Sequence, residues 1–254
     1  MDVYWLEQSE GDVAPNDDWL SVVEQAHLNA LRVPKRRADW RLGRWTAKRA
    51  LAAHLRAPGD LSSLANFEIR PAPSGAPEVY SLGRRASVTI SLSHRNGTAL
   101  CAIGASGAQL GCDLELIEPR SEAFVADYFT KEEQALISQL HSTDMPLFLT
   151  LLWSAKESTL KALHEGLRLD TRSVIVSLPD AARASEASGL SLPSEGDTDW
   201  YPLEVRCTNG QVFHGWWQRA VAFVRTLVGA PFPTTPTVLT LPSLLHGETS
   251  LDRG

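Results

Sequence analysis

Asp113 and Glu115 are the first residues whose type and spacing indicate chemistry. They lie two positions apart in Gly111–Leu116, a segment with the alternation typical of a strand. Because side chains alternate faces along a strand, both carboxylates are expected on one face, with Cys112 and Leu114 turned into the core. Like charges on one face repel, so a hard divalent ion shared with a substrate phosphate is expected between them. The alternative is an edge strand whose acidic face is only solvated.

A second pair, Glu157 and Lys161, lies four residues apart in a segment that is predicted to be helical. At this spacing the two side chains share one helix face with Trp153 and His164. One interpretation is a surface ion pair worth a few tenths of a kcal/mol. The other adds a third carboxylate to the metal site and a cation that offsets phosphate charge.

The third feature is a basic segment between Arg32 and Arg56, which holds nine basic residues and one acidic residue, Asp39. Four of its cations follow each other at steps of four, three and four residues, and they line one helix face if the helix begins a turn before Asp39: Arg37, Arg41, Arg44 and Lys48. Such a face is either solvated or neutralised by a bound anion. Because the whole chain carries a net charge of -6, the asymmetry favours a local anion site over a general nucleic-acid surface.

These motifs together resemble the 4′-phosphopantetheinyl transferases. The resemblance rests on the order of three segments, Ser91-Leu92-Ser93-His94, Gly111-Cys112-Asp113-Leu114-Glu115 and Trp153-Ser154-Ala155-Lys156-Glu157-Ser158 followed by Lys161. Tyr128-Phe129-Thr130-Lys131-Glu132-Glu133 is similar to the family segment between the two acidic motifs. The length and the N-terminal half resemble the larger, two-halved surfactin-synthetase-activating type.

The resemblance implies an α+β fold of two similar halves, residues 1–107 and 108–254, which are related by a pseudo-two-fold axis. Coenzyme A and Mg²⁺, or Mn²⁺, would bind in the cleft between the halves. The enzyme would transfer the 4′-phosphopantetheine arm of coenzyme A to a serine of an apo acyl or peptidyl carrier protein and release 3′,5′-ADP. By the same resemblance, Asp113, Glu115 and Glu157 hold the metal, Glu157 accepts the serine proton, and Lys161 neutralises phosphate charge.

The coenzyme contacts implied by the resemblance come from both halves. Ser93, His94, Lys156 and Lys161 would lie near the phosphates. The basic stripe would hold the 3′-phosphate and the adenine end through Arg37, Arg44 and Lys48. The sequence departs from the family at Ala76, where a coenzyme-contacting lysine is common. Either nearby Arg84 or Arg85 substitutes for that lysine, or the coenzyme affinity is lower.

Two other classes of function are open to this sequence. A non-catalytic module could bind a carrier protein or an anionic ligand, although the complete set of acidic residues argues against lost activity. A serine hydrolase would use Ser93 and His94, but adjacent residues rarely form a nucleophile–base pair, and Gly104–Ala108 departs from the GxSxG pattern at its last position.

The composition is ordinary for a soluble globular protein of 254 residues, 43% of them hydrophobic. Its three cysteines are odd in number and widely spaced, so we expect neither a disulfide framework nor a zinc site, as suits a reducing cytoplasm. The acidic N-terminus is unlike a signal peptide, and no apolar stretch approaches the length of a membrane span. A cytoplasmic monomer that binds neither nucleic acid nor membrane is expected.

The elements that position these residues follow from periodicity and turn signals. Helices are predicted over Asp17–Leu31, Asp39–Leu55, Ser121–Phe129, Lys131–His141 and Leu147–His164. Strands are predicted over Val3–Leu6, Phe67–Arg70, Ser87–Leu92, Ala99–Ile103, Leu110–Ile117, Ser173–Leu178, Leu203–Cys207, Val212–Trp217 and Ala220–Leu227. Asp180–Asp199 is predicted to be a mobile loop, and the proline-rich tail after Gly229 to be extended. We find no clear internal sequence repeat.

Overall fold

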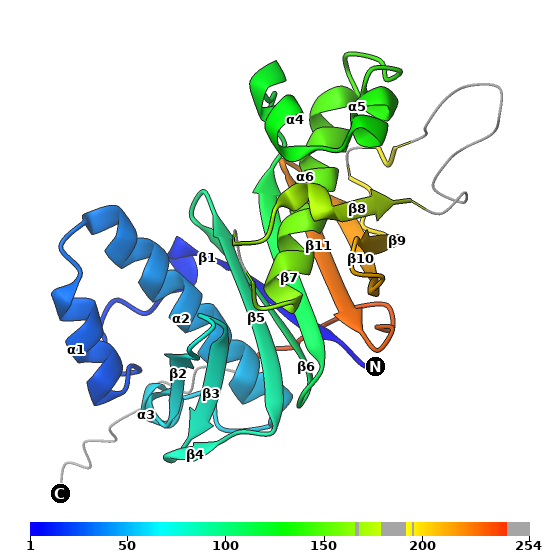
Figure 1. Cartoon of the computed structure of the whole chain (residues 1–254). Coiled ribbons are helices and arrows are strands. Elements are labelled where there is room, and N and C mark those ends of the chain that lie inside the picture. Colours follow the sequence, from blue (N-terminus) through cyan, green and yellow to red (C-terminus); the bar gives the residue numbers. More distant parts are fainter. Residues whose placement is uncertain (166–167, 179–191, 195, 243–254) are drawn as a thin grey trace, which may run out of the picture.

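The first sheet forms around the N-terminal strand. The computed structural model describes residues 1–165, 168–178, 192–194 and 196–242, and four of its strands pair in the order β12-β1-β6-β5. These strands are Thr237–Val238, Tyr4–Ser9, Thr98–Ala105 and Val88–Arg95. The long helix α2, Pro34–His54, packs against β1, β5 and β6, with α1 (Val22–Ala30) and α3 (Leu61–Ala65) beside it (Figure 1).

The second sheet carries the acidic motif at its edge. Five strands pair in the order β7-β11-β10-β9-β8, and all of these pairs are antiparallel. They are Gln109–Leu116, Phe223–Ala230, Val212–Ala220, Tyr201–Cys207 and Val174–Ser177. The long helix α6, Met145–Ala162, packs on this sheet, and α4 (Glu122–Tyr128) and α5 (Lys131–Ile137) lie beside it (Figure 1). The fold is therefore α+β.

A third, smaller sheet lies near the end of α2. Its strands pair in the order β2-β3-β4 and span Phe67–Pro71, Pro77–Ser81 and Arg84–Arg85. Two single 3-10 turns, Glu10–Asp12 and Thr171–Ser173, complete the regular elements of the described residues. The loop between β2 and β3 contains Ala76.

The two large sheets meet where β5 lies beside β7. Ser91 Oγ accepts a hydrogen bond from the Cys112 backbone N–H at 2.9 Å, and Ser93 Oγ donates to Asp113 Oδ1 at 2.8 Å. Behind this junction, Arg225 of β11 makes a bidentate ion pair with Glu7 of β1, with both N···O distances at 2.6 Å. The strand that bears Asp113 is therefore enclosed, and the prediction of a merely solvated acidic edge does not describe it.

Gly111 allows α6 to approach β7 closely. A Cβ atom at this position would lie 1.7 Å from the Ser158 carbonyl oxygen and 2.9 Å from the Ala162 nitrogen. Real Cβ contacts are never this short, so only glycine permits the helix to cross the strand here. The crossing brings the last turns of α6 next to Asp113.

Most predicted elements are present, with shifted ends. The first helix begins at Val22 instead of Asp17, because Ser21 caps it by accepting a hydrogen bond from the Glu24 N–H. The second begins at Pro34, five residues before the predicted start, so the basic residues do share one helix. Strands β3 and β4 and helix α3 were missed, because each is only two to five residues long.

The C-terminal tail returns to the first sheet. Thr237 and Val238 pair in parallel with Tyr4 and Trp5, and the Met1 amino group donates to the Phe232 carbonyl at 2.6 Å. The chain after residue 107 thus contributes to the N-terminal sheet as well, while the division at residue 107 and the pseudo-two-fold axis remain predictions.

Most of the predicted loop Asp180–Asp199 lies outside the described residues. Within the described part, no helix is both long and apolar enough to cross a membrane.

Candidate active site

A cavity of about 420 Å³ lies between the two long helices, where β5 and the β2–β3 loop face the end of α6. Its lining includes four of the predicted coenzyme ligands: Arg44, Ser93, His94 and Lys161. Arg44 comes from α2, Ser93 and His94 from β5, and Lys161 from α6. Two cations on different helices therefore face one cavity.

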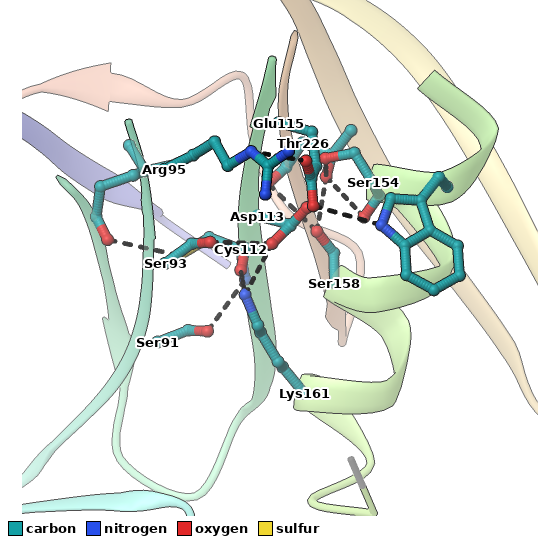
Figure 2. A network of polar contacts seen from close by, with 12 residues as sticks. Ser91, Ser93, Arg95, Cys112, Asp113, Glu115, Ser154, Ser158, Lys161 and Thr226 are labelled. Atoms are coloured by element: carbon teal, nitrogen blue, oxygen red, sulfur yellow. Dashed lines mark hydrogen bonds and ion pairs between the residues drawn. The ribbon is translucent and has the colours of Figure 1, made fainter. Parts of the chain in front are cut away.

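Asp113 lies at the junction of β5, β7 and α6. Its Oδ1 accepts hydrogen bonds from Lys161 Nζ at 2.7 Å and from Ser93 Oγ at 2.8 Å (Figure 2). Its Oδ2 is buried and has no hydrogen-bond partner among the described residues. An unpaired buried carboxylate oxygen is costly, so this atom is a candidate contact for a cation.

Glu115 is held differently from Asp113. Its Oε1 accepts a hydrogen bond from Trp153 Nε1 at 3.2 Å, while its Oε2 lies 3.3 Å from Arg120 and 3.5 Å from Arg95. The predicted sharing of one face is correct, but two guanidinium groups already neutralise this carboxylate. Arg120 and Arg95 were not predicted as partners, because both come from outside the acidic motif.

Glu157 has strongly perturbed acid–base behaviour. Burial, followed by the negative charge of Asp113, raises the pKa of its carboxyl group from 4.5 to about 7; Lys161 opposes this rise and Glu115 adds to it. Its Oε1 is buried without a hydrogen-bond partner among the described residues. The three predicted acidic residues are thus close enough to influence each other's ionisation.

Lys161 bridges the strand and the cavity. Its ammonium group donates to Asp113 and to the Cys112 carbonyl oxygen at 3.0 Å, and 28% of its side chain remains exposed. Burial tends to lower its pKa, but Asp113 and the other negative groups around it raise the pKa above its usual value. Lys161 is therefore a fixed positive charge at the cavity wall.

A hydroxyl network fixes the turns of α6 that carry these residues. Thr226 of β11 pairs with Asp113 of β7, and its Oγ1 lies 2.5 Å from Ser158 Oγ and 2.9 Å from Ser154 Oγ (Figure 2). All three hydroxyl groups are buried. Since Ser154 and Ser158 flank Glu157, the network holds that part of the helix against the sheet.

The donor set suits a hard divalent cation, although the described residues do not gather three histidine, cysteine or acidic groups into a ready metal cluster. Two buried carboxylate oxygens, Asp113 Oδ2 and Glu157 Oε1, have no hydrogen-bond partner among the described residues. Mg²⁺ prefers oxygen ligands and usually takes one or two carboxylates together with water and substrate phosphates. Asp113 and Glu157 fit this requirement, whereas Glu115 would first have to leave its arginines.

The basic stripe divides into residues at the cavity and residues used elsewhere. Arg44 reaches the cavity and stacks over the Trp40 ring at 4.9 Å. Arg37 instead donates to the Leu28 carbonyl at 2.6 Å, and it does not line the cavity. Lys48 is fully buried against Glu24 at 2.5 Å.

Lys156, predicted to contact the coenzyme, is also fully buried and pairs with Glu133 at 2.9 Å. Neither it nor Lys48 lines the cavity, so neither ammonium group is available to a ligand there.

Sequence reasoning missed one cation of the cavity, Arg70 at the end of β2. It pairs with Glu68 at 2.9 Å and lies over the Tyr80 ring at 4.3 Å. The expected substitutes for the missing lysine, Arg84 and Arg85, are exposed on β4 and do not line the cavity. An isolated arginine outside the basic segment carried no signal that could have identified it.

Comparison with known proteins finds similarity to one family of enzymes. A family model described as the 4′-phosphopantetheinyl transferase superfamily matches residues 109–205, which include β7 and α6. The chain is 27% identical over 191 residues to the 4′-phosphopantetheinyl transferase HetI of Nostoc sp., covering 74% of this chain and 78% of HetI. It is 28% identical over 133 residues to a Synechocystis sp. protein named "Putative 4′-phosphopantetheinyl transferase slr0495", covering 52% of this chain and 51% of that protein.

Residues 109–205 are therefore similar to the 4′-phosphopantetheinyl transferase superfamily, and both relatives carry the name of that enzyme. The protein is an enzyme of the phosphopantetheinyl transferase class.

Proposed function

We propose that this enzyme transfers the 4′-phosphopantetheine arm of coenzyme A to a serine of an apo acyl or peptidyl carrier protein. The observation that supports this most directly is the cavity lined by Arg44 and Lys161, next to the carboxylates of Asp113 and Glu157. Coenzyme A carries a pyrophosphate and a separate 3′-phosphate, so it needs two cationic regions. Phosphoryl transfer depends on alignment and charge neutralisation, which this arrangement supplies.

Glu157 is the proposed general base. Its pKa of about 7 means that near neutral pH a substantial fraction is deprotonated and still basic enough to accept a proton. The serine oxygen forms a bond to the phosphorus that bears the pantetheine arm, and its proton passes to Glu157. The bond from that phosphorus to the bridging oxygen breaks, and 3′,5′-ADP leaves.

Lys161 and Arg44 are proposed to hold the two charged ends of the coenzyme. Lys161, already fixed by Asp113, would offset the charge that grows on the leaving phosphate. Arg44 presents a guanidinium that suits the paired hydrogen bonds of the 3′-phosphate. Ser93 and His94 line the same cavity and complete the proposed contacts.

Mg²⁺, or Mn²⁺, is the proposed metal, with Asp113 and Glu157 as ligands and Glu115 as the third predicted ligand. When bound, the ion would neutralise charge on the pyrophosphate and help align it. The unpartnered oxygens of Asp113 and Glu157 support this assignment.

The finer type and setting are proposals as well. Two large sheets, each packed against one long helix, support the two-halved surfactin-synthetase-activating type. We propose that the enzyme acts as a monomer in the cytoplasm, on soluble carrier proteins.

Intact mass spectrometry of apo carrier proteins tests the proposal. Incubation with the enzyme, coenzyme A and Mg²⁺ should add about 340 Da, the mass of one phosphopantetheine arm, to a carrier serine. The control is the Glu157→Gln variant under the same conditions, which should add nothing at matched times. Carrier binding by the wild type with no mass gain on any acyl or peptidyl carrier would instead indicate a non-catalytic binding module.

A further inference from the structure

The two long helices share a short motif. Helix α2 contains Trp-Thr-Ala-Lys at residues 45–48, and α6 contains Trp-Ser-Ala-Lys at residues 153–156. Four residues in a chain of 254 are too few to stand out as a repeat. In the structure both lysines are fully buried, and each pairs with a glutamate.

Lys156 uses its whole ammonium group on buried acceptors. It donates to the Thr171 carbonyl at 2.9 Å, to the Val174 carbonyl, and to Glu133 Oε2 at 2.9 Å. A lysine ammonium has three N–H donors. All three are therefore occupied, and none is left for a phosphate.

Glu133 extends this contact to two further elements. It belongs to the capping box of α5, where its Oε2 accepts the Thr130 backbone N–H at 2.9 Å. Its Oε1 accepts the Val176 backbone N–H of β8 at 3.2 Å. The Lys156–Glu133 pair thus joins α6, the start of α5 and the edge strand of the second sheet.

The first half repeats these contacts. Lys48 pairs with Glu24 Oε2 at 2.5 Å and donates to the Trp19 carbonyl at 2.9 Å. Glu24 Oε2 also accepts the Ser21 backbone N–H in the capping box of α1, and its Oε1 accepts the Ile69 N–H of β2. Each lysine Nζ also lies less than 6 Å from the centre of an aromatic ring just before the capped helix: Trp19 for Lys48 and Phe129 for Lys156.

The residue that follows each lysine differs between the halves. After Lys156 comes Glu157, the proposed base. After Lys48 comes Arg49, which donates to the Gly59 and Pro242 carbonyls and so holds the C-terminal tail. The buried lysine–glutamate pair is thus present in both halves, although the residue after Lys48 is an arginine and not an acidic residue. The role of the pair therefore does not depend on the reaction chemistry.

We propose that Lys156 is a positioning residue and not a coenzyme ligand. Its ion pair with Glu133 fixes the rotation of α6 about its axis and its position along that axis, so that Glu157 and Lys161 face Asp113. The inference rests on the proposed roles of Glu157 and Lys161. It differs from what the family resemblance implies for Lys156, and it makes Lys156 the counterpart of Lys48.

The test compares Lys156→Met, Glu133→Gln and the double variant with wild type, and uses Lys161→Met as the matched control. Melting temperature, kcat, KM for coenzyme A, and calorimetric affinity for coenzyme A are measured. Kinetics are run below the lowest melting temperature, so that every variant is folded. Glu133→Gln keeps the ammonium group of Lys156 while removing the carboxylate that holds it.

A positioning role predicts that Lys156→Met and Glu133→Gln each lower kcat about tenfold or more, with coenzyme affinity within about threefold of wild type. The double variant should melt higher and turn over faster than Lys156→Met, because it no longer buries an unpaired carboxylate. Lys161→Met should weaken coenzyme binding about tenfold or more.

A direct coenzyme contact predicts the opposite pattern. Lys156→Met would then weaken coenzyme binding as strongly as Lys161→Met, Glu133→Gln would retain wild-type kcat, and the double variant would turn over no faster than Lys156→Met. Any of these results overturns the inference, and Glu133→Gln decides the matter if Lys156→Met does not fold. If wild type transfers nothing to any carrier, the proposed function fails, while the calorimetric comparison still decides whether Lys156 contacts coenzyme.

Discussion

Replacing Glu157 by glutamine tests the electrostatics of the site without relying on turnover. In the folded protein, burial and the neighbouring charges of Asp113 and Glu115 raise the pKa of this carboxyl group from 4.5 to about 7. The folded state therefore binds the proton more tightly than the unfolded chain does. Deprotonation is thus unfavourable to folding, and glutamine removes it while preserving the shape of the side chain.

The magnitude follows from the linkage between ionisation and folding. Below pH 4.5 the group is protonated in both states and contributes no penalty. Between pH 4.5 and about 7 the penalty grows by 1.36 kcal/mol for each pH unit, and above that range it is complete, at about 3 kcal/mol. The free energy of unfolding of Glu157→Gln should therefore exceed that of wild type by about 2–3 kcal/mol at pH 8 and by less than about 1 kcal/mol at pH 5.

Urea unfolding at pH 5, 6, 7 and 8, in the presence of a chelator, measures this difference directly. Glu132→Gln is the matched control, because the Glu132 side chain lies on α5 and is exposed to solvent. This substitution should leave the pH dependence of the free energy of unfolding unchanged. Added Mg²⁺ should then stabilise the wild type at pH 8 more than it stabilises Glu157→Gln, since the variant lacks one of the two proposed carboxylate ligands.

The reasoning is refuted if the difference between Glu157→Gln and wild type is the same at pH 5 and pH 8, or if the variant is less stable at pH 8. Either outcome would mean that the carboxylate is compensated in the metal-free protein. The same conclusion would follow if, in the presence of the chelator, wild type and variant had equal free energies of unfolding at every pH.

Four other substitutions give three separate predictions. Arg44→Ala should reduce the preference for coenzyme A over dephospho-coenzyme A by about 10- to 150-fold in calorimetric titrations; equal affinities in wild type would remove the 3′-phosphate from this site. Gly111→Ala should destabilise the fold by more than about 2 kcal/mol, because its Cβ would clash with the Ser158 carbonyl, whereas Gly43→Ala, with open space around it in α2, should gain about 0.5–1 kcal/mol in urea unfolding. Asp113→Asn should lower kcat at least about 100-fold while the protein stays folded by circular dichroism, and a near-normal rate would remove Asp113 from the reaction.

Local patterns in the sequence determined the parts of the site that depend on one element. Alternation along β7 put Asp113 and Glu115 on one face, and helical spacing put Glu157 and Lys161 on one face of α6; the structure contains both arrangements. The turn between β5 and β6 is equally local, because Asn96 and Gly97 adopt the positive φ angles that a two-residue hairpin turn requires. These features are local, so periodicity and turn chemistry are sufficient to predict them.

Tertiary structure alone decided which of these groups remain free to act. Glu115 is taken by Arg95 and Arg120, and Lys48 and Lys156 are buried against glutamates that lie more than twenty residues away in the chain. A side chain's hydrogen-bond partners and its desolvation depend on every element packed around it, and spacing along one helix does not contain that information. For the same reason, the pKa of Glu157 and the burial of Asp113 between two sheets arise only when β5, β7 and α6 come together.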